Sequence, residues 1–205
     1  GDWSSDVCSS DLKNQGIAPG VRAAFILPKK PANLLKAILP KESGKVELAF
    51  DSKNACFKLS DFVLNCLLIE GNYPNYNSVI PTNNPNRLII DRALFVNVLR
   101  RVSVFADAAL GLAKLQLKNG ELVVSTENKD YSISAEEKVA CNYTGDDLTI
   151  GFKASFLIEI LNNISATEVL VELSDPTRAG VILPLENKEN EDLLMLLMPM
   201  MLSDF

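Results

Sequence analysis

Three stretches with one pattern decide the fold of this chain: Leu34-Leu35-x-x-Ile38-Leu39, Leu94-Phe95-x-x-Val98-Leu99 and Phe156-Leu157-x-x-Ile160-Leu161. They begin 60 and then 62 residues apart, at positions 34, 94 and 156. Each stretch places apolar pairs on one face of a short helix and leaves the opposite face free. A pattern that returns at a nearly constant interval predicts a chain built from like modules.

Each predicted helix has the same neighbours along the chain. A short apolar run comes before it, at Ala24–Leu27, Leu88–Ile90 and Leu148–Ile150, and three strand-like runs follow it. The sequence therefore predicts an α+β fold of repeated β-α-β-β-β units, whose helices form one shared surface. Such an assembly favours a scaffold or ring over an enzyme with one private cleft.

The first module is expected from Arg22 to Glu70, with a helix that begins near Pro31 and stops at Pro40. The second runs from Arg87 to Asn142, and the third from Asp147 to Leu202. The later strands are predicted at 46–50, 55–59 and 62–69, at 113–117, 121–125 and 131–140, and at 169–173, 179–183 and 193–198. A polar turn at 51–54 and an Asn-Gly hairpin at 118–120 separate strands of the first and second modules.

A Pro- and Asn-rich segment, Gly71–Asn86, separates the first module from the second. Prolines at this density exclude a continuous helix, so the segment is interpreted as a domain connector. The second and third modules meet without such a spacer and are interpreted as two halves of one domain, residues 87–205. Residues 22–70 are then the second half of a preceding domain.

The opening residues, 1–12, have neither a helical nor a strand period. They resemble the translation of a sequencing adapter fused to a truncated reading frame, and a Ser-rich disordered tail is the alternative. All four methionines lie between Met195 and Met201, so the natural start of translation is expected to be missing. The run is therefore left out of the fold prediction.

Composition narrows the functional classes. Hydrophobic residues make up 47% of the chain, which allows a buried core, and no apolar run approaches a membrane span. The isolated Cys56, Cys66 and Cys141 are interpreted as buried thiols of a cytosolic protein. With no histidine and no phosphate-binding loop, neither a metal nor a cofactor is expected. The net charge of −6 argues against a protein that coats nucleic acid generically.

Three motifs resemble one known family. The connector run 71–81, Gly-Asn-Tyr-Pro-Asn-Tyr-Asn-Ser-Val-Ile-Pro, is similar to the segment that joins the second and third domains of the bacterial sliding clamp, the β subunit of DNA polymerase III. Leu148–Phe152 resembles the family's strand-to-helix step, and Met195–Met200 resembles its C-terminal strand ending in Met-Pro-Met. The similarity covers Ala24 to Leu202.

The resemblance implies a DNA-clamp fold, with helices on one face of curved antiparallel sheets. It also implies a non-catalytic processivity factor that encircles duplex DNA as a homodimeric ring. Its partners would be the polymerase III catalytic subunit, the clamp loader and other proteins with clamp-binding motifs, in the cytoplasm. A clamp needs basic helices that attract phosphates loosely. The residues expected to face DNA are Lys29, Lys30, Lys36, Arg92, Arg100, Arg101 and Lys153.

The resemblance further implies a hydrophobic pocket for partner peptides. The matching positions are Pro74, Val79, Leu196, Met198, Pro199 and Met200. The positions that depart from the family's usual residues are Ser78, Lys153, Phe156 and Ala179. Val104 and Phe105 would belong to the dimer interface, and without an upstream domain this polypeptide is not expected to close a normal ring.

Simpler interpretations of the same residues remain open. The basic residues could be ordinary solvated helix faces, and 195–201 a buried edge strand. A peptide-binding module without DNA function is the alternative to a clamp, and the salt dependence of duplex binding separates the two. A small-molecule enzyme is the third option, but the sequence shows no convergent acid cluster or histidine to support it.

Overall fold

The computed structural model describes residues 8–12, 24–71, 75–189 and 191–202. The chain divides into two compact units: unit 1 comprises residues 1–15 and 76–205, and unit 2 comprises residues 16–75. Within the described ranges, no helix is both long and apolar enough to span a membrane.

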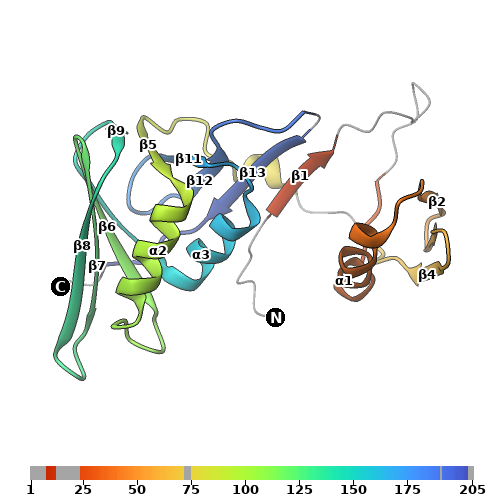
Figure 1. Ribbon diagram of the computed structural model, residues 1–205. Helices are drawn as coiled ribbons and strands as arrows, with labels where there is room; N and C mark the ends of the chain where they lie inside the picture. Colours follow the sequence, from red (N-terminus) through yellow and green to blue (C-terminus); the bar gives the residue numbers. More distant parts are fainter. Residues whose placement is uncertain (1–7, 13–23, 72–74, 190, 203–205) are drawn as a thin grey trace. The chain divides into compact units, whose positions relative to one another are not determined.

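Unit 1 holds two β-α-β-β-β halves (Figure 1). The first half consists of β5 (Asn86–Asp91), α2 (Arg92–Ser103), β6 (Leu112–Lys118), β7 (Glu121–Asn128) and β8 (Ile133–Ala140). The second consists of β10 (Leu148–Lys153), α3 (Ala154–Asn163), β11 (Glu168–Leu173), β12 (Gly180–Pro184) and β13 (Glu191–Leu197). The remaining elements are β1 (Cys8–Leu12), a 3-10 turn η2 (Tyr76–Ser78) and the short strand β9 (Asn142–Thr144).

The two halves exchange their first strands. The six-stranded sheet has the order β1-β13-β12-β11-β5-β9, and the four-stranded sheet has the order β10-β6-β7-β8. Thus β5 of the first half pairs with β11 of the second, and β10 of the second pairs with β6 of the first; all these pairs are antiparallel. Because each sheet needs strands from both halves, the halves form one folded body.

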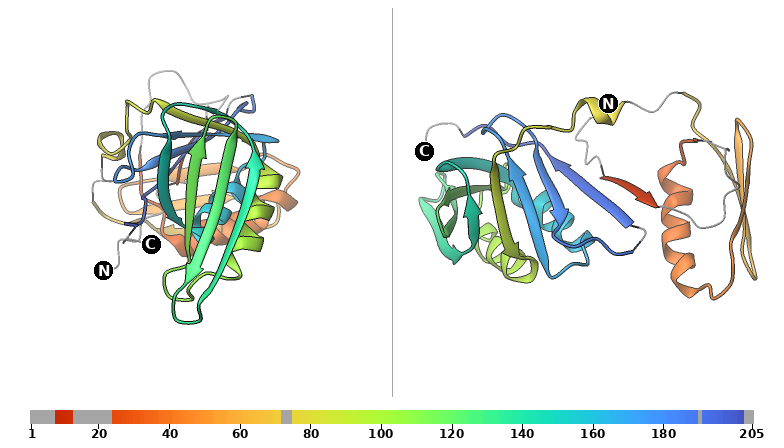
Figure 2. Two further views of the ribbon diagram at one scale, coloured as in Figure 1. Left: turned by 90° about the vertical axis from the view of Figure 1, so that its left-hand side faces the viewer. Right: turned by 90° about the horizontal axis from the view of Figure 1, so that it is seen from above.

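The core of unit 1 lies between the two sheets and the paired helices α2 and α3, which lie side by side (Figures 1 and 2). The apolar pattern predicts which residues fill it: Phe95, Leu99, Leu157 and Leu161 are essentially inaccessible to solvent. Helix α2 begins where Asp91 Oδ1 accepts the backbone N–H of Leu94 at 2.7 Å, an N-cap of the usual kind.

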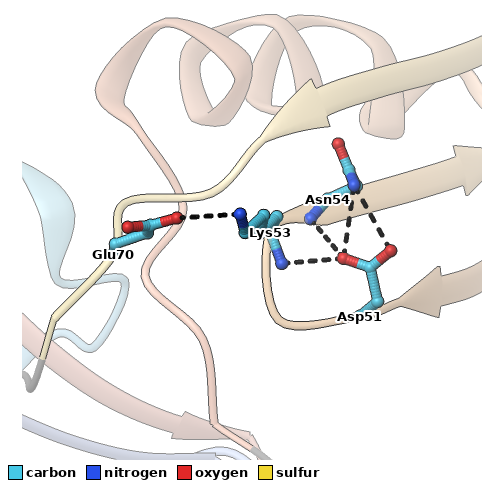
Figure 3. Close-up of polar contacts among 4 residues, drawn as sticks. All are labelled: Asp51, Lys53, Asn54 and Glu70. Atoms are coloured by element: carbon cyan, nitrogen blue, oxygen red, sulfur yellow. Dashed lines mark hydrogen bonds and ion pairs between the residues drawn. The ribbon is translucent and has the colours of Figure 1, made fainter.

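Unit 2 is a smaller α+β body. It consists of α1 (Lys29–Ile38), the 3-10 turn η1 (Leu39–Lys41) and a three-stranded antiparallel sheet of order β2-β3-β4, formed by Glu47–Phe50, Asn54–Lys58 and Val63–Leu67. The predicted polar turn at 51–54 is confirmed (Figure 3). There, Asp51 Oδ1 accepts the backbone N–H groups of Lys53 and Asn54, both at 2.7 Å. These bonds favour the carboxylate and lower the pKa of Asp51.

Several details differ from the sequence-based expectations. Residues 24–27 form no continuous strand; among the described residues they make one bridge, Ile26 with Ile69. Helix α1 agrees with the prediction, since Pro31 is its third residue, in the first turn, and the helix ends at Ile38, before Pro40 in η1. Cys56, Cys66 and Cys141 are half-buried and not fully buried.

The opening run also differs, because Cys8–Leu12 forms strand β1 on the edge of β13. Backbone groups of an exposed strand edge accept a neighbour whatever its side-chain pattern, which is why periodicity gave no signal there.

Candidate functional site

Strands β12 and β13 are apolar on both faces. On β13, Leu193, Met195 and Leu197 point into the core, while Leu194 and Leu196 point to the other side. Those two residues belong to a second, smaller cluster, which we name the outer apolar patch. Its members are Ile80, Ala179, Val181, Leu183, Leu194 and Leu196. Because neither face of these strands is polar, the face that points away from the core also needs apolar groups to cover it.

Met198 directly follows β13, and the strand's alternation, continued by one residue past Leu197, would give it the same side as Leu194 and Leu196. Its side chain is 62% exposed, and that of Val79 is exposed as well. A flexible thioether beside an apolar patch suits a surface that repacks around different ligands.

The Met-Pro-Met segment is fixed onto β10 by the chain's backbone. The N–H of Met200 donates to the carbonyl oxygen of Gly151 at 2.8 Å, and the two residues form an isolated bridge. A Cβ atom on Gly151 would lie 2.8 Å from both Leu112 Cδ1 and Leu202 Cδ2. Glycine at position 151 therefore allows the close approach that holds Pro199 and Met200 in place.

At the start of α3, Lys153 Nζ lies 5.0 Å from the centre of the Phe156 ring, a cation–π contact between two half-buried residues. The sequence assigned Lys153 to both predicted surfaces.

The structure therefore brings together part of the predicted peptide pocket. Ala179 and Leu196 meet in the outer apolar patch, Val79 and Met198 are exposed, and Ser78 is exposed in η2. Pro74 lies outside the described residues. The sequence analysis missed Ile80, Val181, Leu183 and Leu194. Alternation along 179–183 and 193–198 was the signal that could have found the last three.

Apart from Lys153, which lies over the Phe156 ring, the predicted DNA-facing residues separate into two groups. Arg92 is engaged within the fold, since its Nε donates to the carbonyl of Ala166 at 2.9 Å and its Nη1 to that of Leu161 at 3.4 Å. Arg101 forms a two-bond ion pair with Glu137 on β8, at 3.0 and 2.5 Å. This pair lowers the pKa of Glu137 and raises that of Arg101.

The second group has no ion-pair partner among the described residues. It consists of Lys29, Lys30 and Lys36 on α1 and Arg100 on α2, all exposed. These side chains keep their charge available for a ligand.

Val104 and Phe105, assigned to the dimer interface, follow α2 directly, and both are exposed. Ile133, the first residue of the edge strand β8, and Tyr131, two residues before it, are also exposed. In the described part of the chain, no group of acidic, cysteine or histidine side chains could hold a metal ion.

Residues 77–201 match the sequence profile of the DNA polymerase III beta subunit, C-terminal domain. The chain belongs to this family. Among curated relatives, the beta sliding clamp of Pseudomonas aeruginosa is 27% identical over 96% of this chain and 52% of its own length. That of Treponema pallidum is 30% identical over 89% of this chain and 49% of its own.

Solved structures agree with the family assignment. The P. aeruginosa sliding clamp bound to griselimycin superposes with a TM-score of 0.86 at 26% identity, over 92% of this chain and 50% of that one. The Bartonella birtlesii clamp gives 0.83 at 31% identity, over 92% and 54%. The expected clamp fold is thus confirmed, and the chain spans about half the length of the relatives it matches.

Proposed function

We propose that this chain is part of a replicative processivity clamp, a non-catalytic scaffold that holds duplex DNA and docks partner proteins in the bacterial cytoplasm. The outer apolar patch carries this proposal: it is a second hydrophobic cluster on a domain of the clamp family, half-buried at Ile80, Leu183 and Leu194, and the apolar side chains of Val79 and Met198 next to it in the sequence are exposed. In this assignment residues 87–205 are the third clamp domain, 71–86 the connector, 22–70 the second half of the second domain, and 1–12 a non-native tail.

The partner site extends from the outer apolar patch to Met198, Pro199 and Met200, with Val79 and Ser78 from the connector and Lys153 and Phe156 at its rim. Its ligands are apolar peptide segments of the polymerase III catalytic subunit, the clamp loader and other clamp-binding proteins. Related clamps have been crystallised with griselimycin, which supplies a direct probe for this chain.

DNA contact would be electrostatic and independent of sequence. Lys29, Lys30, Lys36 and Arg100, which have no ion-pair partner in the described part of the chain, attract phosphates. Arg92 and Arg101 chiefly hold α2 in position through bonds that include those to α3 and β8. Duplex binding should therefore be weak and should collapse with salt. Binding that is insensitive to salt, or absent at low salt, would favour the alternative of a peptide-binding scaffold without DNA function.

Val104 and Phe105 would contribute to the ring interface of the longer protein. Their exposure fits a surface that is covered by another protomer.

The test of the partner site is titration calorimetry with griselimycin and two matched variants. Met198→Asp puts a charge on the exposed residue that follows β13, and Met201→Asp puts the same charge on an exposed methionine outside the site. We expect Met198→Asp to raise Kd at least tenfold and Met201→Asp to change it less than twofold. Equal effects of the two variants, or no binding by the parent chain, would refute the assigned site.

A further inference from the structure

The outer face of the six-stranded sheet carries an apolar row that extends well beyond the proposed peptide site. Strands β5, β11, β12 and β13 belong to this sheet, and on each of them outward residues alternate with those that point into the core (Figure 1). In the middle of the outer face, every one of the four strands presents a half-buried aliphatic side chain. We name these four residues the outer row: Ile89, Leu170, Leu183 and Leu194.

The register of the strands makes the members of the outer row neighbours. Ile89 pairs with Leu170, and Leu170 pairs with Leu183. Leu183 and Leu194 pack against one buried cluster in the outer apolar patch. The row therefore crosses four strands without a polar residue, whereas the solvated face of an antiparallel sheet is normally polar.

One side of the outer row is acidic. The next outward position is Asp91 on β5, Glu168 on β11 and Asp192 on β13, and we name these three residues the acidic edge. Asp91 is occupied in part as the N-cap of α2. Glu168 and Asp192 are exposed, and neither has an ion-pair partner among the residues that the structure describes.

On the other side of the outer row the charges cancel. Arg87 of β5 donates to Glu172 Oε1 of β11 from Nη2 at 2.7 Å and from Nε at 3.0 Å. The same row continues on β12 and β13 with Val181 and Leu196, which are buried. The electrostatic field along the outer row is therefore one-sided, and a positively charged ligand is favoured on the side of the acidic edge.

A hollow of about 390 Å³ opens where the acidic edge reaches the loop after β12. Its lining includes Glu168, Glu186 and a single basic residue, Lys188. Leu185, which is 39% exposed, lines it as well, and its N–H donates to the carbonyl of Glu168 at 3.0 Å. The hollow thus offers an apolar wall and two carboxylates to one long basic side chain.

We propose that the outer row binds an amphipathic basic helix of a partner protein. The apolar side chains of this helix lie on the outer row, and its Lys or Arg side chains point toward the acidic edge. The inner strands of a sheet have no free backbone groups to offer a visiting strand, so the occupant satisfies its own backbone hydrogen bonds, as a helix does.

The size of the row fits such a helix. Neighbouring strands lie about 4.8 Å apart, so four strands span about 14 Å, the length of roughly ten helical residues. The outer row shares Leu183 and Leu194 with the outer apolar patch, but Ile89, Leu170 and the acidic edge lie outside the proposed peptide site. The inference depends on the sheet face and its charges, and it does not require the clamp function.

The first test is fluorescence anisotropy of the 205-residue chain with a labelled, capped peptide of about 14 residues, which has leucine at i, i+3 and i+4 spacing and lysine elsewhere. Leu170→Lys charges the centre of the outer row, and Ile133→Lys adds the same charge to an exposed residue of β8 on the other sheet. We expect Leu170→Lys to raise the Kd of the peptide at least tenfold, and Ile133→Lys to change it less than twofold.

A second pair of variants leaves the apolar row intact. Glu168→Gln combined with Asp192→Asn removes two charges from the acidic edge, and Glu127→Gln combined with Glu136→Gln removes two exposed charges from β7 and β8. At low salt the first pair should raise the Kd at least fivefold and the second less than twofold. A peptide with glutamate in place of lysine should bind the parent chain at least tenfold more weakly.

Three results would overturn the proposal. They are no saturable binding of the leucine–lysine peptide by the parent chain, equal effects within either pair of variants, and equal affinity for the glutamate peptide. Self-association of the parent chain that Leu170→Lys abolishes would assign the outer row to a second copy and would also overturn it. Griselimycin binding, measured on the same samples, reports separately on the proposed function.

Discussion

Substitution of Gly151 by alanine tests whether one missing Cβ holds the Met-Pro-Met segment in place. The backbone at Gly151 is not in the left-handed region, so alanine is allowed there and its effect is steric. The new methyl group would lie 2.8 Å from the ends of Leu112 and Leu202 and 3.2 Å from the carbonyl oxygen of Met200.

The loss of unfolding free energy in Gly151→Ala can be worked out from these contacts. Each of the two leucine side chains must leave its preferred rotamer, at about 0.5–1.5 kcal/mol apiece. The hydrogen bond from Met200 to Gly151 lengthens and loses part of its roughly 1 kcal/mol. The total is about 2–3 kcal/mol, within the usual range for overpacking. For a unit of this size that lowers Tm by about 4–12 °C.

Differential scanning calorimetry of the chain measures this change. Gly44→Ala is the matched control, because its Cβ would meet one exposed side-chain end, Ser60 Oγ, at 3.2 Å. Griselimycin affinity should fall in Gly151→Ala and stay constant in Gly44→Ala. A Gly151→Ala chain that melts within about 1 °C of the parent would refute the reasoning, since a clash of this size should not be silent.

Three other predictions follow from the structure. Leu99→Ala should lower the unfolding free energy by about 2–5 kcal/mol in urea titration, while Leu39→Ala at the equivalent, exposed position should cost less than half as much; equal losses would contradict the burial difference. Arg100→Ala should reduce the slope of the logarithm of the association constant for duplex DNA against log salt by about 1. An unchanged slope would show that Arg100 does not contact DNA. The pKa of Asp51 is depressed below its ordinary 3.8 in the folded chain, so its carboxylate stabilises unit 2 above about pH 4 and loses that effect as pH falls through the folded pKa. In Asp51→Asn, the stability of unit 2, followed by circular dichroism, should fall less steeply than in the parent as the pH is lowered. An unchanged pH dependence would contradict this role of Asp51.

The apolar pattern predicted the helices and their buried faces well, because it depends on residues only three and four positions apart. Apolar pairs three and four residues apart must share a helix face, and the structure buries Phe95, Leu99, Leu157 and Leu161 as expected. The exchange of first strands was not predicted, since pairing between β5 and β11 depends on residues far apart in the sequence.

The candidate site was recovered in part for a similar reason. Ala179 and Leu196 came from a resemblance, and the structure adds Ile80 to their cluster from the connector, a contact that no strand periodicity contains. The roles of Arg92 and Arg101 were likewise hidden, because a basic residue on a helix looks the same in sequence whether its guanidinium is unpaired or bonded to a carbonyl or carboxylate of the same fold.

The exchanged strands of unit 1 also bear on how the protein is made. Leu88 of β5 pairs with Val171, 83 residues later in the chain. When the first half of unit 1 has left the ribosome, β11, the pairing partner of β5, has therefore not yet been synthesised. That nascent half cannot close its own sheet, so unit 1 must fold in one late step, and a chaperone that shields β5 in the interval would raise its yield.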